Sequence, residues 1–395
     1  MNTEQFIAKF ASENVHSLAL KASKYPEVDM HFALNQIAGR QAAMKKLPLW
    51  AATEGVVYPP HISMEQCSSE FTARYKQGVL QRLAGTDYTL TDLTGGFGVD
   101  FMYMSESSSK AVYVERNTAL CDTARHNASV FGRTNVEIVN SLAEDYLKVM
   151  ESSDIIYADP ARRDTSGART YAISDCTPDV LELLPLLLAK ARYVFIKLSP
   201  MLDHNKAVSD INSIQRCVKE VHIVSTGGEC KELLLLLSAD SEENYNIYCI
   251  NDTSEYSFTS DETTIPPSIC NDEDYAEMYL YEPNASIMKA GCFGKLTRTY
   301  NMSVMAINSN LFLSHEIIGN FPGRSFRVLC TTTMNKKELS RALSGIKKAN
   351  ITVRNFPNTV AELRKRLKLG DGGNTYIFAT TTSKAVHQLL ICEKL

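Results

Sequence analysis

The sequence has 395 residues, of which 44% are hydrophobic and 22% are charged, and its formal net charge is −4 at pH 7. This length predicts two or three domains, and the composition is that of an ordinary soluble globular protein. We find no signal peptide and no run approaching the roughly 20 apolar residues of a membrane span, so we expect a cytoplasmic protein with no membrane partner. The ten cysteines and eight histidines form no CxxC pair or ligand-spaced cluster, so neither disulfides nor a metal site is indicated.

Residues 1–62 predict a helical N-terminal unit. Apolar residues recur at helical spacing over residues 1–46, and Pro48 and the pair Pro59-Pro60 interrupt the pattern. The single tryptophan, Trp50, lies in this connection, where core packing is favoured over base stacking.

A second helix is predicted after Ser68 and Ser69, either of which is a suitable N-cap, and it should end before Gly85. The serines thus have a structural explanation. The functional alternative is that this loop and helix close over the amino-acid end of a cofactor, with Thr72 and Lys76 nearby. Both interpretations remain open.

From residue 88 to about residue 238 the sequence alternates between strand-like and helix-like segments, which is typical of a doubly wound, mainly parallel sheet. Strands are expected at 88–92, 111–115, 135–139, 154–158, 192–198, 220–225 and 232–238. Only residues 226–231 separate the last two, which is too short for a parallel crossover. The final pair should therefore be an antiparallel hairpin, as in methyltransferases and unlike the fully parallel dinucleotide-binding sheet.

The glycine-rich stretch 92–100 follows the first of these strands and reads Asp-Leu-Thr-Gly-Gly-Phe-Gly-Val-Asp. Glycines let the backbone approach a ligand closely. Phe101 stands where a dinucleotide fingerprint needs its third small residue, so that fingerprint is broken. Glu115 ends the next strand, where it can accept hydrogen bonds from two ribose hydroxyls. This combination suits S-adenosylmethionine, with Asp92, the turn amides and Asp100 near its methionine portion.

A second motif, Asp159-Pro160, directly follows an apolar strand, which places a carboxylate at the ligand-binding edge of the sheet. Asp159 can accept a hydrogen bond from an acceptor amine and so orient its lone pair. Arg162 and Arg163 are suited to phosphate or carboxylate, although an ion pair with Asp164 or Asp175 is the structural alternative.

Lys197 lies in an otherwise apolar run at the end of the next predicted strand. It could neutralise a buried acid such as Asp159, or it could contact substrate. The sequence does not decide between these roles. The Asp159-Pro160 motif contains no cysteine, so a covalent route to pyrimidine C5 is unsupported.

The remaining chain is divided into an acidic connection, a small α+β segment and a basic C-terminal segment, at 241–275, 276–325 and 326–395. The last should contain strands at 326–332, 350–354, 375–380 and 387–392 and helices at 335–348 and 358–368. Between residues 331 and 371 there are ten Lys or Arg against three acids. This basic cluster indicates a surface for a polyanion, with a solvated helix face as the alternative.

Taken together, residues 92–100, Glu115 and Asp159-Pro160 resemble the class I S-adenosylmethionine-dependent methyltransferases. More narrowly, residues 68–73, residues 159–163 and the basic segment resemble a bacterial group with a THUMP-like C-terminal domain, distantly similar to the trimethylguanosine synthase type of RNA methyltransferase. The methyltransferase likeness covers about residues 63–240.

The resemblance implies an α/β protein with a Rossmann-like seven-stranded sheet in residues 63–240, a ferredoxin-like subdomain at 276–325 and a THUMP-like domain at 326–395. It implies S-adenosylmethionine as the cofactor and structured RNA, tRNA or rRNA, as substrate. The expected cofactor-binding residues are Thr72, Asp92, Thr94, Gly95, Gly96, Gly98, Asp100, Glu115, Arg116 and Ser141. The expected catalytic residues are Asp159 and Pro160, and the expected substrate-binding residues are Arg162, Arg163, Lys197, Arg364, Lys365 and Arg366.

Two departures from the family pattern limit this transfer. Relatives that methylate exocyclic base nitrogens follow Asp/Asn-Pro-Pro with an aromatic residue, whereas Ala161 and Arg162 stand here. Base stacking would come from elsewhere, such as Tyr171, or the target is another atom. The usual acidic contact to adenine is replaced by residues 140–142.

Our leading hypothesis is an RNA methyltransferase in which Asp159 orients the acceptor. The alternatives are a non-catalytic RNA-binding or assembly factor that retains the cofactor pocket, and a small-molecule methyltransferase. The sequence gives no oligomeric state.

Overall fold

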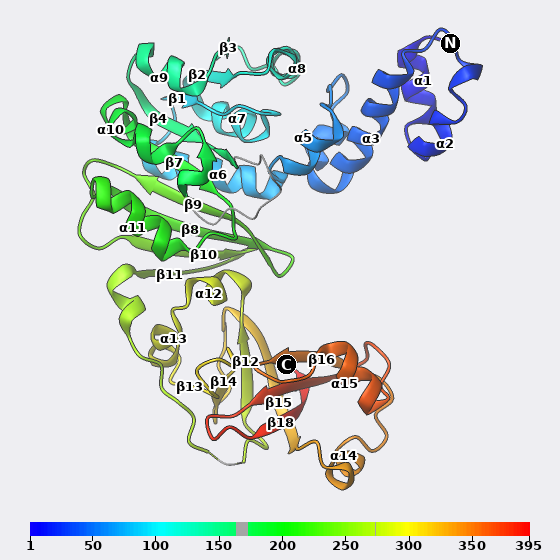
Figure 1. Ribbon diagram of the computed structural model, residues 1–395, viewed down its shortest axis with the longest axis vertical. Helices are drawn as coiled ribbons and strands as arrows, with labels where there is room; N and C mark the ends of the chain where they lie inside the picture. Colours follow the sequence, from blue (N-terminus) through cyan, green and yellow to red (C-terminus); the bar gives the residue numbers. More distant parts are fainter. Residues whose placement is uncertain (163–172, 273) are drawn as a thin grey trace. The chain divides into compact units, whose positions relative to one another are not determined.

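The computed structural model describes residues 1–162, 173–272 and 274–395 (Figure 1). The chain divides into two compact units. The first comprises Met1–Lys219 and Glu232–Glu243, and the second comprises Glu220–Lys231 and Asn244–Leu395. None of the described helices is both long enough and apolar enough to cross a bilayer.

Unit 1 begins with helices, and side-chain caps explain where the first three of them start. Asn2, Asn14 and Asp29 each accept a hydrogen bond from a backbone N–H in the first turn of the helix that follows. These helices are α1 (Thr3–Phe10), α2 (Val15–Ala19), α3 (Met30–Lys46), α4 (Pro48–Ala52) and α5 (His61–Gln66), with a 3₁₀ turn at Ala22–Lys24.

Trp50 connects these helices to the sheet-containing part of unit 1. Its side chain is 1% exposed, and its ring lies 4.9 Å from that of Phe97 and 4.8 Å from that of Phe131. Asn127 reinforces this connection through hydrogen bonds with both the N–H and the carbonyl of Val57. The predicted packing role of Trp50 is confirmed.

In the described residues a large sheet has the strand order β11-β10-β8-β9-β7-β4-β1-β2-β3. Its strands are β1 (Tyr88–Asp92), β2 (Ser108–Glu115), β3 (Val136–Asn140), β4 (Ser153–Ala158), β7 (Ala191–Leu198), β8 (Val218–Thr226), β9 (Glu229–Leu237), β10 (Asn246–Asn251) and β11 (Ser254–Thr259). The pairs from β3 to β7 are parallel, and β9 runs antiparallel to β7. Gly227 and Gly228, with φ of +60° and +80°, form the tight turn between β8 and β9.

The predicted α/β fold is confirmed, and the sheet is larger than the seven strands expected. Strands β10 and β11 extend it beyond β8, because β10 pairs with β8 in parallel and β11 folds back on β10. The run at Ser254–Thr259 was not predicted as a strand, since its side chains are mostly polar and only Phe258 is fully buried.

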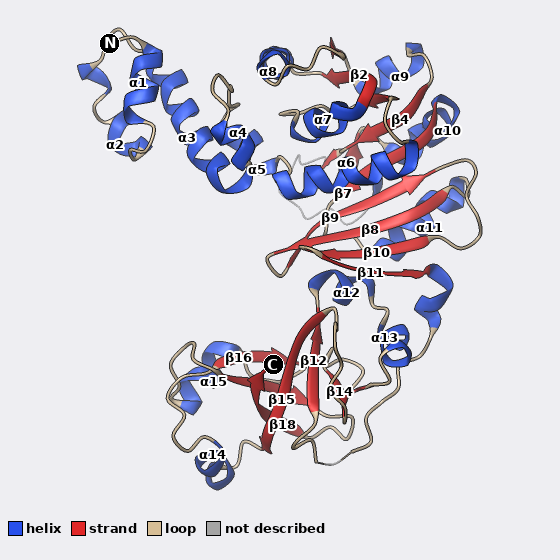
Figure 2. Ribbon diagram, turned by 180° about the vertical axis from the view of Figure 1, so that it is seen from behind, coloured by secondary structure: helices blue, strands red, loops and turns tan. Residues whose placement is uncertain are grey.

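Helices lie on both faces of this sheet: α10 and α11 are in front of it in Figure 1, and α6 is in front in the reverse view of Figure 2. The helices are α6 (Glu70–Ala84), α7 (Val99–Met104), α8 (Thr118–Val130), α9 (Ala143–Val149), α10 (Val180–Lys190) and α11 (His204–Ile214). Short 3₁₀ turns occur at Ser105–Ser107 and Ile173–Asp175, and a two-stranded ribbon pairs β5 (Ala161–Arg162) with β6 (Cys176–Thr177). Ser69, one of the two serines predicted as the N-cap of this helix, is the N-cap of α6.

Unit 2 contains a second sheet with the order β13-β14-β12-β15-β18-β17-β16. Its strands are β12 (Tyr279–Pro283), β13 (Ser303–Val304), β14 (Phe312–Ser314), β15 (Gly323–Thr332), β16 (Asn350–Arg354), β17 (Thr375–Thr381) and β18 (His387–Lys394). Its helices are α12 (Ala285–Ala290), α13 (Phe293–Thr299), α14 (Lys336–Ala342) and α15 (Val360–Leu367), with a 3₁₀ turn at Ser260–Thr264. Helix α14 is shorter than the predicted 335–348, because Gly345 at φ +81° ends any helical continuation.

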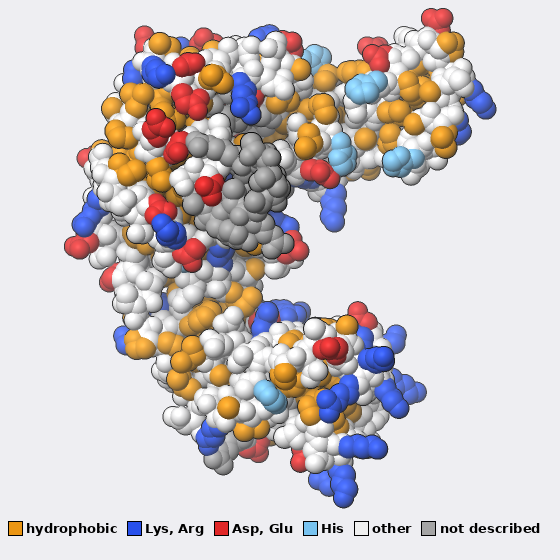
Figure 3. All heavy atoms as spheres, viewed as in Figure 1, with side chains coloured by type: hydrophobic (Ala, Val, Ile, Leu, Met, Phe, Trp, Pro, Cys, Tyr) orange, Lys and Arg blue, Asp and Glu red, His pale blue; other side chains and the backbone are white. Residues whose placement is uncertain are grey.

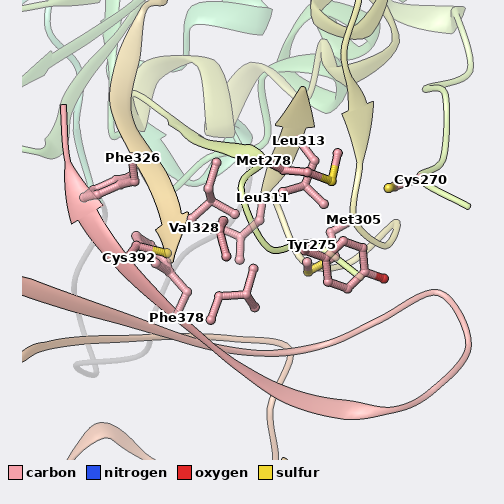
Figure 4. Close-up of a cluster of buried hydrophobic side chains, with 12 residues drawn as sticks. Cys270, Tyr275, Met278, Met305, Leu311, Leu313, Phe326, Val328, Phe378 and Cys392 are labelled. Carbon is pink, nitrogen blue, oxygen red and sulfur yellow. The ribbon is translucent and has the colours of Figure 1, made fainter. Parts of the chain in front are cut away.

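Alternate residues of β17 and β18 enter two different cores. Phe378 and Leu390 belong to a core that includes Phe326 and Leu313, shown in Figure 4. Their neighbours Ile377, Ala379, Leu389 and Ile391 face the other side, where Leu363 of α15 packs on them. This period of two means that α14 and α15 cover only one face of the second sheet.

Candidate active site

The glycine loop after β1 has a backbone that only glycine suits. A Cβ atom on Gly95 would lie 2.1 Å from the ring of Tyr113, and Gly96 and Gly98 have φ of +55° and +85°. The N–H of Gly95 donates to the carbonyl of Val114 at 2.9 Å. The loop is therefore packed directly against β2.

Two side chains of β2 fix the loop further. The Tyr113 hydroxyl donates to the carbonyl of Gly96 at 2.5 Å. The Glu115 carboxylate accepts from the N–H of Gly96 at 3.0 Å and from the N–H of Asn117 at 2.8 Å. Each carboxylate oxygen has a second acceptor site, so Glu115 retains the capacity to accept two more hydrogen bonds.

Three other residues, Ser141, Arg116 and Thr72, were predicted to bind the cofactor. The Ser141 N–H donates to the carbonyl of Glu115 at 3.2 Å, which places Ser141 beside the end of β2. Arg116 is exposed. Thr72 is 1% exposed, and its hydroxyl donates to the carbonyl of Ser69 within the first turn of α6.

Thr94 links the loop to the Asp-Pro motif. Asp92 is 1% exposed, and its carboxylate accepts from the N–H of Thr94 at 2.9 Å and from its hydroxyl at 3.3 Å. The Thr94 oxygen accepts in turn from the N–H of Asp159 at 2.6 Å. Burial raises the pKa of Asp92 to about 8, in spite of these hydrogen bonds.

Lys197 holds the side chain of Asp159. Its ammonium lies 2.6 Å from the Asp159 carboxylate and 3.9 Å from that of Asp100. Of the two roles left open for Lys197, the contact with the acid Asp159 is the one observed. Burial raises the pKa of Asp159, against the opposing charge of Lys197. For Lys197 burial acts in the opposite direction, but Asp159, Asp100 and Glu232 raise its pKa overall.

Behind this pair lies a group of polar side chains that we call the buried network: Ser68, Lys76, Asp100, Tyr157 and Glu232. The Asp100 carboxylate accepts from the hydroxyls of Ser68 at 2.7 Å and Tyr157 at 2.8 Å, and it lies 3.2 Å from the Lys76 ammonium. Lys76 is fully buried and lies 2.5 Å from Glu232. Burial alone would raise the pKa of Asp100, but Lys76 and Lys197 lower it overall.

The network changes the interpretation of Asp100. Asp100 was predicted to approach the cofactor. Its side chain is only 10% exposed, and its carboxylate contacts Ser68, Tyr157 and Lys76 of the protein itself. Ser68, Tyr157 and Glu232 were not predicted as site residues. The sequence feature that could have indicated this network is Lys76, a charged residue four positions after Thr72 and therefore on the same, buried side of α6.

These groups meet at one edge of the sheet. Asp92 is the last residue of β1, Asp159 follows the last residue of β4, and Lys197 is the penultimate residue of β7. The carboxyl ends of parallel strands are where doubly wound sheets bind their ligands. Pro160 and Ala161 continue from this edge, and the backbone of Arg162 lies in β5. The Arg162 side chain, Arg163 and Tyr171 lie outside the described residues.

No group of three or more potential metal ligands is present in the residues that the structure describes.

The ten basic residues between residues 331 and 371 fall into two classes. Arg354 pairs with Glu282, and Arg364 pairs with Asp371 at 2.7 Å and donates to the carbonyl of Ala349 at 3.2 Å. The others are exposed, and no ion pair is found for them among the described residues. We call these the basic surface: Lys336, Lys337, Arg341, Lys347, Lys348, Lys365, Arg366 and Lys368. Figure 3 shows Lys and Arg side chains gathered over α14 and α15.

Comparison with known proteins bears on the whole chain. Residues 323–394 match the family model of a THUMP domain-like domain, and residues 279–322 match that of a ferredoxin-like domain. No curated protein sequence matches. The chain superposes on the crystal structure of a "putative methyltransferase" from Porphyromonas gingivalis W83 with 29% identity and a TM-score of 0.84, covering 100% of this chain and 99% of that chain.

Two further solved structures match only part of the chain. One is a "putative methyltransferase" from Streptococcus mutans in complex with SAH, at 12% identity, covering 42% of this chain and 95% of that chain. The other is an rRNA methylase from Streptococcus thermophilus, at 15% identity, covering 42% and 94%. Both have a TM-score of 0.32, which is too low to support a conclusion. The full-length match and the C-terminal family model confirm the predicted resemblance of this chain to methyltransferases with a THUMP-like C-terminal domain.

Proposed function

We propose that the protein is an S-adenosylmethionine-dependent methyltransferase that acts on a base in structured RNA, tRNA or rRNA. The observation that carries this proposal is the fixed position of Asp159. Its N–H is bound by Thr94 of the glycine loop, and its carboxylate is bound by Lys197. The residue expected to orient the methyl acceptor is thus tied directly to the loop expected to hold the methyl donor.

The residues of the loop fit this cofactor. Gly96 and Gly98 adopt conformations with positive φ, and Glu115 at the end of β2 keeps two free acceptor positions for ribose hydroxyls. Gly95, Ser141 and Arg116 lie on segments next to Glu115, and we expect them to contact the cofactor as well. When bound, S-adenosylmethionine would supply a methyl group on a positively charged sulfur, which is a good leaving group.

Asp159 would contribute alignment. Its carboxylate side chain is 38% exposed, so it is accessible to an acceptor while Lys197 restricts its rotation. An ionised Asp159 can accept a hydrogen bond from an acceptor N–H and direct the nitrogen lone pair toward the methyl group. In this role Lys197 is a positioning residue, and Thr94 fixes the backbone that carries the carboxylate.

RNA as the substrate is supported by the basic surface and the THUMP-like match. Exposed cations that are not neutralised by neighbouring acids bind a phosphate backbone through release of its counterions. Lys365 and Arg366 belong to this surface. Arg364, predicted with them, is engaged by Asp371 and by a backbone carbonyl, so we expect it to support α15 more than to bind RNA.

Calorimetric titration of the full chain with S-adenosylmethionine and, separately, with NAD tests the cofactor. Binding of S-adenosylmethionine alone is expected, and tight binding of NAD without it would refute the proposal.

Incubation of the protein with methyl-labelled cofactor and a cell extract, divided into RNA and small-molecule fractions, tests the substrate. Label in the small-molecule fraction would favour the small-molecule enzyme, and cofactor and RNA binding without any transfer would favour the assembly factor.

A further inference from the structure

A second polar group lies in unit 2, on the sheet formed by the ferredoxin-like and THUMP-like segments. Glu282 of β12 is 4% exposed and accepts from Nε of Arg324 at 2.8 Å. Its other oxygen accepts from Nη2 of Arg354 at 2.8 Å. We call these three residues the Glu282 triad.

The triad carries more positive than negative charge. Two guanidinium groups share one carboxylate, and the described residues provide no further acid within 4 Å of either arginine. The side chains of Arg324 and Arg354 are 46% and 32% exposed, so a ligand from solvent can reach them while Glu282 stays covered. Because Glu282 holds both guanidinium groups in place, little side-chain entropy would be lost when they bind an anion.

The triad borders a row of side chains with unsatisfied polar atoms. Arg354 is paired in register with Thr380, and Thr380 with Gln388. Thr380 is completely buried, and Thr380 Oγ1, Gln388 Oε1 and Arg354 Nε are all buried without a hydrogen-bond partner. Leaving buried polar atoms unpaired is unfavourable. Two of the three, the Thr380 hydroxyl and Arg354 Nε, are donors, so they indicate that a group with acceptor atoms binds there.

This row lies on the face opposite the basic surface. Thr380 is two residues from Phe378, and Gln388 is two residues from Leu390, so all four point to the face of the core in Figure 4. Helices α14 and α15, which carry most of the basic surface, pack on the other face. The two groups of cations are therefore separate features of the same sheet.

A purely structural role explains only part of this arrangement. Strands β12 and β16 are separated in the sheet by β15, β18 and β17, so the contact between Glu282 and Arg354 ties together parts of a curved sheet. One arginine would make that tie and leave it neutral. The second arginine, the exposed guanidinium edges and the unpaired Thr380 hydroxyl are left unexplained.

We propose that Arg324 and Arg354, together with Thr380, form a binding site for a phosphate group. Guanidinium groups bind phosphate oxygens through paired N–H donors, and the Thr380 hydroxyl can donate one further hydrogen bond. The phosphate belongs either to an RNA strand or to a free nucleotide. Its assignment to RNA rests on the proposed function, whereas phosphate binding itself does not.

The test uses the full-length chain titrated with inorganic phosphate and with 5′-AMP, followed by line broadening in phosphorus NMR. Replacing Arg324→Gln or Arg354→Gln should weaken phosphate binding about tenfold, the effect of losing a charge-assisted hydrogen bond. Arg327→Gln is the matched control, because Arg327 is also half-exposed on β15 and paired with an acid, Glu277, away from the triad. Equal affinity in all three variants would overturn the proposal.

Glu282→Gln separates ligand binding from a structural role by the sign of the effect. Removal of the competing carboxylate frees both guanidinium groups, so phosphate should bind several-fold more tightly even if the melting temperature falls. Unchanged or weaker binding by a folded Glu282→Gln protein would contradict the site. Arg354→Lys, which keeps one charged contact to Glu282, provides a second comparison if Arg354→Gln does not fold.

RNA binding by the same variants identifies the source of the phosphate. Parallel losses of RNA and phosphate affinity would assign the site to RNA. Loss of phosphate and AMP affinity with unchanged RNA affinity would assign it to a free nucleotide and overturn its assignment to RNA. Retained phosphate binding by a protein that transfers no methyl group to RNA would refute the proposed function and leave the phosphate site standing.

Discussion

The buried network of unit 1 and the basic surface of unit 2 use charge in opposite ways. Lys76 is fully buried and contacts two carboxylates, whereas Lys365 and Arg366 are exposed and have no acidic partner among the described residues. Buried charges must be paired, and once paired they fix geometry. Exposed cations contribute little to the fold and remain available to a polyanion. The paired, buried charges are suited to holding catalytic groups in a fixed geometry. The unpaired, exposed cations are suited to binding a polyanion.

The largest expected effect comes from breaking the buried network. Lys76→Met would leave Asp100 and Glu232 buried without their ammonium partner, which should reduce the free energy of unfolding by about 3–5 kcal/mol. Urea denaturation followed by circular dichroism measures this loss. Lys148→Met is the control, because Lys148 pairs with Asp145 on the surface and should change stability by less than about 1 kcal/mol. Similar losses in both variants would contradict the contrast between buried and exposed pairs.

Removal of the Asp159 carboxylate should affect catalysis more than binding. We expect Asp159→Asn to lower kcat for methyl transfer by about 100-fold or more, since the acceptor would lose its alignment. The affinity for S-adenosylmethionine, measured by calorimetry, should stay nearly unchanged. Asp145→Asn, at an exposed position on α9, is the matched control. A parallel loss of cofactor affinity would indicate that Asp159 binds the methyl donor and does not orient the methyl acceptor.

The pH dependence of transfer should sharpen the role of Lys197. Burial raises the pKa of Asp159 above its ordinary value of 3.8, and protonated Asp159 cannot accept from the acceptor. The rate should therefore fall as the pH drops through this raised pKa. Lys197→Met removes the charge that opposes this increase in the pKa of Asp159. The acidic limb of the pH–rate profile should therefore move to higher pH. An unmoved limb, with only a lower rate, would indicate that Lys197 is merely structural.

The smallest effects are expected on the basic surface. Charge reversal of Lys365 and Arg366 should leave stability unchanged and weaken RNA binding, and the slope of log affinity against log salt should fall by about 0.9 for each phosphate that the surface no longer neutralises. Filter binding over a range of salt concentrations measures the slope. Lys110→Glu, at an exposed position on β2, is the control. An unchanged slope would exclude these residues from RNA docking.

The sequence predicted features that depend on neighbouring residues. The ends of β1 and β4 were placed because an apolar run leads into Asp92 and Asp159, and the hairpin of β8 and β9 followed from the length of its connection. Charge counting located the basic surface but included Arg364, because it did not show that Asp371 lies within 2.7 Å.

The features that the sequence did not predict depend on contacts between distant residues. Lys76 and Glu232 are separated by 156 positions, and nothing in either local pattern identifies the other as its partner. Tyr157 is one residue of an apolar strand until the fold brings its hydroxyl to Asp100 at 2.8 Å. Likewise, Arg354 and Glu282 become partners only because the second sheet brings β16 to β12.

The central claim is that the loop holding Asp159 serves methyl transfer to RNA. The most direct test is transfer of labelled methyl from S-adenosylmethionine to total RNA isolated from a strain lacking this gene, followed by nucleoside mapping. We predict that label enters one nucleoside in that RNA, that RNA from the parent strain accepts little because its site is already methylated, and that Asp159→Asn abolishes the signal. Absence of label from RNA with a protein that binds S-adenosylmethionine would contradict the account.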